Sequence, residues 1–221
     1  MHQRFEALGL LQGVKGVLVH DGLISYKGLD CTHSLCNAHH IRELVYVHEQ
    51  ENQKIWHSWA QEMIDLLLLV LKEVDAKEAA LNTRRQAWFH AQWSELLERG
   101  EQFNPPNQRT GTSQDAGLGS RGRLKQSKAT NLLRRLRDHR EDVWRFMSQD
   151  GVPFTNNLAE QALRMSKVKQ KISGCFRTEH GADTFFTIRS YLATMHKQKG
   201  NLFDCLVSVF NRQTIQPCFT E

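Results

Sequence analysis

The segment GVKGVLVHDG, residues 13–22, contains a short run of apolar and β-branched residues that stops at His20 and Asp21. This pattern predicts a buried strand, which Gly22 ends. The strand would hold the Asp21 carboxylate at its tip, on a rigid scaffold and open to a ligand. An acid in this place is a candidate for chemistry.

The sequence after this strand predicts a second short strand and then a series of helices. The second strand is expected at residues 32–36, and Asn37 is typical of an N-cap for a helix over residues 38–49. Apolar residues spaced three and four apart predict further helices at residues 54–80, 83–98, 125–147, 158–171, 182–198 and 202–210. We expect Gly200 and Asn201 to cap the helix over residues 182–198.

The apolar sides of these helices are the expected core. In residues 83–98 they consist of Trp88, Phe89 and Trp93. In residues 125–147 they consist of Leu132, Leu133, Leu136, Val143, Trp144 and Met147. In residues 182–198 they consist of Phe185, Phe186, Ile188, Leu192 and Met195. The fold class is therefore α+β and mostly helical.

Composition is that of an ordinary globular protein with a mild excess of positive charge. The chain has 221 residues, 40% hydrophobic and 24% charged, and a net charge of +5, which is compatible with a polyanionic partner. The longest apolar run, residues 66–71, is far shorter than the roughly 20 residues that span a bilayer. Five cysteines without a signal-peptide pattern favour reduced thiols. We expect a cytoplasmic protein with no membrane partner.

Two acids have settings that suit metal chemistry. Asp21 follows a strand, and Glu160 lies in the first turn of a helix that follows Asn156 and Asn157. Carboxylates that converge from different elements form an oxygen-rich site for Mg²⁺ or Mn²⁺. From these residues alone, the simpler interpretation is a turn aspartate and a helix N-terminal glutamate favoured by the helix dipole.

Two further groups of residues have alternative interpretations. Cys31, His33, Cys36 and His39 are zinc-ligand types, but their spacing is not that of a standard finger. His39 and His40 are instead expected to line the same site as Asp21 or to contact phosphate. After Glu160 comes a basic group that would either hold a nucleic-acid backbone or form a solvated face: Arg164, Lys167, Lys169, Lys171 and Arg177.

These pieces, in this order, resemble the insertion-sequence-66 type of DDE transposases of bacteria. The resemblance is carried by VHDGLISY, HSLCNAHHIREL, RGRLKQSKATNLLRRLRDHREDVWRFM, VPFTNNLAEQALRMSKVKQKISGCFRT and GADTFFTIRSYLATMHKQKGN. It implies an RNase H-like mixed sheet with a large helical insertion, and two metal ions, Mg²⁺ or Mn²⁺. The implied reaction is cleavage and joining of DNA at element ends and target. The chain would associate with the nucleoid when bound to DNA.

Within the resemblance, single residues match the family's motifs. Asp21 matches the second catalytic acid and metal ligand, and Glu160 matches the third. The remaining matches and neighbours are candidates for DNA binding or site support: His39, Arg42, Asn156, Asn157, Arg164, Lys167, Lys169, Lys171 and Arg177. Cys36, His39 and Arg42 carry the C-x-A-H-x-x-R pattern.

The resemblance also implies a domain plan. Residues 1–50 correspond to a partial RNase H-like core with the second acid. Residues 51–148 correspond to the helical insertion, with a flexible linker at about 103–122, rich in Pro, Gly and Ser. Residues 149–211 carry the third acid, and residues 212–221 form a tail.

The family's first acid belongs to a DET-like motif before Asp21, and the residues before Asp21 show no such motif. We therefore expect the C-terminal part of a transposase, with an incomplete RNase H-like sheet and with catalysis weak or lost. The alternative is a non-catalytic DNA-binding or dimerising remnant that modulates a full-length transposase. Either form would act as a homo-oligomer or together with that full-length enzyme.

Overall fold

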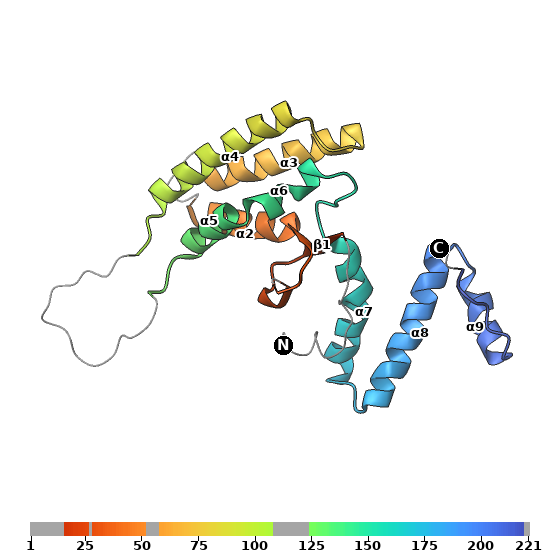
Figure 1. Ribbon diagram of the computed structural model, residues 1–221. Coiled ribbons are helices and arrows are strands. Elements are labelled where there is room, and N and C mark those ends of the chain that lie inside the picture. Colours follow the sequence, from red (N-terminus) through yellow and green to blue (C-terminus); the bar gives the residue numbers. More distant parts are fainter. Residues whose placement is uncertain (1–15, 27, 52–57, 108–123, 219–221) are drawn as a thin grey trace, which may run out of the picture. The chain divides into compact units, whose positions relative to one another are not determined.

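The computed structural model describes residues 16–26, 28–51, 58–107 and 124–218. The chain divides into two compact units, Met1–Asn156 and Asn157–Glu221 (Figure 1). The predictions made for residues 13–15 and 54–57, and for most of the linker, lie outside the described residues. No helix in the described part is long and apolar enough to cross a membrane.

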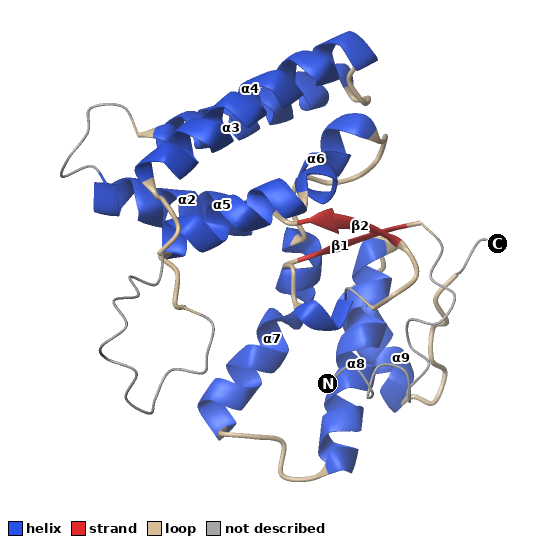
Figure 2. Cartoon of the chain, turned by 60° about the vertical axis from the view of Figure 1, so that its left-hand side comes forward, coloured by secondary structure: helices blue, strands red, loops and turns tan. Residues whose placement is uncertain are grey.

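The first unit contains both predicted strands, which pair in parallel (Figure 2). Strand β1 is Val17–His20 and β2 is Thr32–Leu35, and the 3-10 turn η1, Ile24–Tyr26, lies between them. The two strands are in register from first to last residue, so they end at the same edge. Only His20 of β1 is buried and the other three residues are half-buried, because the described sheet has only two strands.

Helices form the rest of the described part of the first unit. They are α2 (Asn37–Glu51), α3 (Trp59–Lys77), α4 (Thr83–Phe103), α5 (Lys128–Asp138) and α6 (Arg140–Ser148). Their common core includes Trp59, Phe89, Trp93 and Trp144, all buried. The rings of Trp93 and Trp144 meet edge to face with centroids 4.9 Å apart, a favourable aromatic geometry. The described helices and the strand pair confirm the α+β, mostly helical class.

The prediction of one basic helix over residues 125–147 is wrong. The structure has two helices there, which meet at His139 with φ −113° and ψ 29°. Basic residues occupy the last turn of α5 and acidic residues the first turn of α6. These charges suit the dipoles of two separate helices better than the interior of one. The six predicted core residues of this stretch are nevertheless all buried.

Trp88 was predicted to lie in the core and does not. It is 44% exposed, since successive helical residues are about 100° apart and Phe89 takes the buried side. The Arg85 guanidinium lies 4.3 Å from the centroid of the Trp88 ring, which holds the indole at the surface.

The second unit consists of α7 (Asn157–Ser173), α8 (Glu179–Lys197) and α9 (Leu202–Phe210). Met195 and Cys205 are its buried apolar residues in the described part of the chain. Phe186 and Ile188, predicted to face inward, are 45% and 48% exposed. Helix α8 packs against α9, and this packing leaves both side chains about half exposed. Asn201 does not cap α8, because its side chain accepts hydrogen bonds from the first turn of α9.

Candidate active site

The carboxyl-terminal ends of β1 and β2 form the edge where the candidate site begins. The Cys36 N–H donates to the His20 carbonyl at 2.8 Å, which ties the two strand ends together. Asp21 follows directly and is exposed. Its Oδ1 accepts a hydrogen bond from the Leu23 N–H at 3.1 Å. Gly22 has φ +84°, a conformation that glycine adopts readily, so the chain turns sharply and leaves the carboxylate at the edge.

The segment that precedes Glu160 is anchored at this same edge. The Asn37 N–H donates to the Phe154 carbonyl at 3.0 Å. The Asn156 N–H donates to the Cys36 Sγ at 3.4 Å. Two sequence motifs more than a hundred residues apart thus meet beside the strand ends. The buried Asn156 Oδ1 has no hydrogen-bond partner among the described residues, so it offers an oxygen ligand or acceptor.

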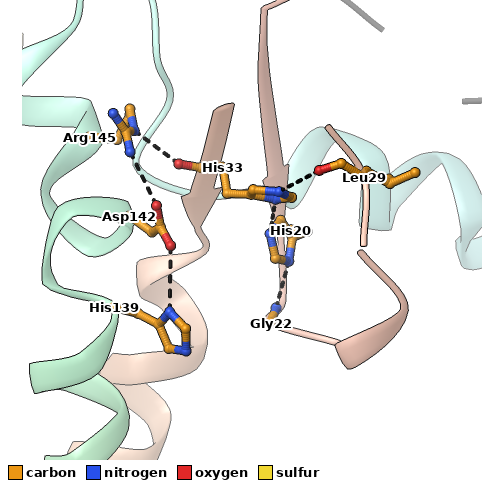
Figure 3. A network of polar contacts seen from close by, with 7 residues as sticks. All are labelled: His20, Gly22, Leu29, His33, His139, Asp142 and Arg145. Atoms are coloured by element: carbon orange, nitrogen blue, oxygen red, sulfur yellow. Dashed lines mark hydrogen bonds and ion pairs between the residues drawn. The ribbon is translucent and has the colours of Figure 1, made fainter. Parts of the chain in front are cut away.

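Two histidines that the sequence did not assign to one site, His20 and His33, lie in contact (Figure 3). The His20 Nε2 is 3.1 Å from the His33 Nδ1, and the His20 Nδ1 accepts from the Gly22 N–H at 3.0 Å. The His33 Nε2 is 3.2 Å from the Leu29 carbonyl. Burial, and then the neighbouring His33, lower the pKa of His20, while the Asp21 charge opposes the shift. This residue is therefore a neutral imidazole at pH 7.

Helix α6 is hydrogen-bonded to the strand that carries His33. The Arg145 Nε donates to the His33 carbonyl at 2.9 Å, and its Nη2 donates to Asp142 at 3.2 Å. The Asn37 Nδ2 donates to the Val143 carbonyl at 3.0 Å. Nothing in the sequence links Arg145 with a strand 112 residues away, whereas the position of His20 beside Asp21 was a signal that could have been used.

The candidates on α2 have separate positions. His40 was expected to line the site or contact phosphate, and this is wrong. It is buried, and burial lowers its pKa to about 3. Its Nδ1 donates to the Asn37 Oδ1 at 3.1 Å, so Asn37 serves this pair rather than a helix cap. His39 is half-buried, and its N–H donates to the Cys36 carbonyl. Arg42 is exposed on the same helix.

Helix α7 carries Glu160 and basic residues on two of its faces. Glu160 is half-buried in its first turn, three residues after the exposed Asn157. Spacings of four, three and four place Arg164, Lys167 and Lys171 on the same helical face as Glu160. Lys169 lies on the opposite face. Together with Arg177 it lines a hollow at the turn between α7 and α8.

The two acids belong to different units, Asp21 to the first and Glu160 to the second. Within the described residues, no three His, Cys, Asp or Glu side chains come together as a metal site. Cys31, His33, Cys36 and His39 therefore do not form a zinc cage there, and the His33 ring is bonded to His20 and Leu29 instead. Oxygen donors such as those of Asp21 and Asn156 suit Mg²⁺ or Mn²⁺ better than zinc.

The comparisons with known proteins agree with the motifs at this edge. The model of the IS66 family of transposases matches residues 3–184, which include both strands and α2 to α7. No curated protein and no solved structure gave a match. The matched region covers most of the chain and contains both acids and the Cys36–Asn156 contact. This chain belongs to the IS66 family of transposases.

Proposed function

We propose that this chain carries out the metal-dependent cleavage and joining of DNA strands typical of a DDE transposase. In this proposal Asp21 and Glu160 bind Mg²⁺ or Mn²⁺, within an RNase H-like core to which β1 and β2 belong. The observation that carries the proposal is the anchoring of Asn156 to Cys36 at the strand edge that bears Asp21. Glu160 follows only four residues later in the sequence.

The oxygen donors give each residue a role. The Asp21 carboxylate keeps lone pairs for a cation, because the structure gives its Oδ1 a single hydrogen bond, from the Leu23 N–H. The Glu160 carboxylate would supply the second anionic ligand. The Asn156 Oδ1, which is buried and has no hydrogen-bond partner among the described residues, would accept a hydrogen bond from a metal-bound water or bind the ion directly. Divalent ions in such sites activate water and stabilise the attacking and leaving oxygens of a phosphodiester.

DNA would lie along the basic side of α7. Arg164, Lys167 and Lys171 share a face with Glu160, so phosphates bound there would pass beside this carboxylate. Backbone contacts of this kind position DNA without reading its sequence. They make the affinity depend on salt: the logarithm of the binding constant falls against the logarithm of the salt concentration with a slope near −0.9 per phosphate contacted. Lys169 and Arg177 would hold a separate part of the strand.

A cleavage assay tests the proposal. DNA that carries the element ends is incubated with Mn²⁺ and this chain, alone and with a transposase segment that supplies the family's first acid. We expect weak or no cleavage alone and clear cleavage with the segment. Glu160→Gln should abolish it, whereas Glu179→Gln, which changes an acid in the first turn of α8, should not. Cleavage that survives Glu160→Gln would exclude the metal-ligand role.

A matched pair of lysines tests the DNA side. Lys167→Ala and Lys169→Ala remove the same charge from opposite faces of one helix. We expect Lys167→Ala to reduce cleavage more than Lys169→Ala at equal DNA occupancy. Equal losses would indicate that the basic residues act only through their net charge.

A second candidate is a non-catalytic chain that binds DNA, forms oligomers and modulates a full-length transposase. It is favoured by the basic face of α7, which needs no metal to bind phosphate. In this case Asp21→Asn and Glu160→Gln would leave both DNA binding and inhibition of the full-length enzyme unchanged. The DDE proposal predicts instead that these variants lose activity and keep DNA binding.

A further inference from the structure

We propose that His20 and His33 are positioning residues for Asp21. A hydrogen-bond chain with a fixed direction runs from the Gly22 N–H through both imidazoles to the Leu29 carbonyl, and it holds the turn that carries the carboxylate (Figure 3). The inference rests on the proposed metal-ligand role of Asp21, which it deepens.

The direction of the chain follows from the groups at its two ends. The Gly22 N–H is only a donor, so the His20 Nδ1 must accept and the His20 proton must be on Nε2. This Nε2–H then donates to the His33 Nδ1. The remaining His33 proton lies on Nε2 and donates to the Leu29 carbonyl, which only accepts. Both rings are therefore neutral Nε2–H tautomers, and the reverse order would leave His20 without any ring proton.

The hydrogen-bond chain fixes the backbone on both sides of Asp21. Before it, the His20 carbonyl accepts from the Cys36 N–H. After it, the Gly22 N–H is held by the His20 ring. The His20 side chain is 4% exposed, and its ring is 5.1 Å from that of Tyr26, so the ring has little room to turn. The carboxylate stands between two fixed peptide groups, which limits the positions that it can reach.

The second histidine is fixed by the helical insertion. The Arg145 Nε donates to the His33 carbonyl, and Arg145 is itself bonded to Asp142, whose other oxygen is 3.6 Å from His139. The hydrogen-bond chain thus connects helix α6 with the turn at Asp21. Outer groups of this kind orient metal ligands and are needed for full affinity.

Nuclear magnetic resonance tests the geometry directly, without metal or DNA. Long-range nitrogen–proton spectra of the imidazoles at neutral pH should show His20 and His33 both protonated on Nε2 alone. The Gly22 amide should be protected from exchange. An Nδ1–H tautomer at either ring, or rapid exchange of the Gly22 amide in the wild type, would overturn the proposal.

Paired variants test the positioning role. His20→Phe keeps an aromatic ring and removes both hydrogen bonds of the imidazole. In His20→Asn, the side-chain amide oxygen can still accept a hydrogen bond from the Gly22 N–H. We expect His20→Phe to expose the Gly22 amide and weaken Mn²⁺ binding roughly tenfold, and His20→Asn to restore much of both. Equal Mn²⁺ affinity in the wild type and His20→Phe would overturn the role.

Two controls separate the possible failures. Val70→Ala removes buried volume from α3, far in sequence from the hydrogen-bonded histidines, and should leave Mn²⁺ binding unchanged. If it weakens binding as much as His20→Phe, the effect is general destabilisation and the positioning role is wrong. Asp21→Asn should abolish Mn²⁺ binding. If it does not, Asp21 is not the ligand and the proposed function fails, even where the tautomers are as expected.

Discussion

Helix α3 in the first unit and helix α7 in the second have similar lengths and opposite burial. Along one face α3 buries Trp59, Met63, Leu67 and Val70, whereas α7 buries no residue in the described chain. A helix gains most of its stability from packing an apolar face. The first unit is therefore stabilised by its own core, and we expect α7 to depend on a ligand or partner. The helix that carries Glu160 and the lysines thus has side chains available for DNA.

The largest effect is expected where the core is densest. Trp93→Ala should lower the free energy of unfolding of the first unit by about 3–5 kcal/mol, because Trp93 is buried and packs edge to face on Trp144. Trp88→Ala, on the same helix but 44% exposed, should cost less than about 1 kcal/mol. Urea unfolding, followed by the fluorescence of the remaining tryptophans, measures both losses of stability. All of these tryptophans precede residue 157 and so report on the first unit. Similar losses would contradict the assigned core.

Acid should weaken the first unit through His40. Its pKa is about 3 in the folded chain against an ordinary 6.5, so the unfolded chain binds the proton more tightly. The stability is complete above pH 6.5 and falls by about 1.4 kcal/mol per pH unit below it. His40→Gln should make this dependence shallower between pH 6.5 and 4.5, as measured by urea unfolding at several pH values, and the lowered pKa of His20 accounts for part of the slope that remains. An unchanged slope would show that His40 is not the group responsible.

A glycine in α4 should respond in the opposite way to most helical glycines. A Cβ at Gly100 would lie 2.7 Å from the Leu133 Cδ2 and 2.9 Å from the Trp59 Cδ2. Gly100→Ala should therefore destabilise the first unit by about 1–3 kcal/mol through overpacking, even though alanine is favoured in helices by up to about 1 kcal/mol. Thermal unfolding gives the sign. Stabilisation would mean that α3, α4 and α5 are less closely packed.

The smallest effect is expected on α7. Ile172 is 79% exposed, so Ile172→Ser should change the stability of the free chain by less than about 0.5 kcal/mol. The measurement is helix unfolding followed by circular dichroism, with Leu67→Ser in α3 as the buried counterpart. A large loss from Ile172→Ser would show that α7 buries this face in solution and would remove the contrast between the two units.

Periodicity in the sequence was enough to predict both strands and most of the helical core. The stripe that includes Leu132, Leu133 and Leu136 is buried as predicted, because apolar spacing determines which side of an element faces inward. The helix break at His139 was missed, since each half is helical by pattern and only tertiary contacts select the break. The exposure of Trp88 was missed because hydrophobicity alone does not exclude a surface position stacked by Arg85.

At the candidate site, the sequence could predict single residues and not their contacts. Asp21 and Asn156 were found by position and by resemblance. The Cys36–Asn156 contact and the bond from Arg145 to His33 join residues more than a hundred positions apart, and no local pattern encodes such pairs. The roles of Asp21 and Glu160 as ligands of one site stay a prediction.

Mn²⁺ binding to four chains tests that role most directly: the wild type, Asp21→Asn, Glu160→Gln and the double variant. If both carboxylates bind one ion, each single variant should weaken Mn²⁺ binding strongly. The double variant should then bind only slightly more weakly than the single variant with the lower affinity, so the effects are not additive. Our account predicts this coupling. Independent effects that add in the double variant, or a Glu160→Gln chain that binds Mn²⁺ as the wild type does, would contradict it.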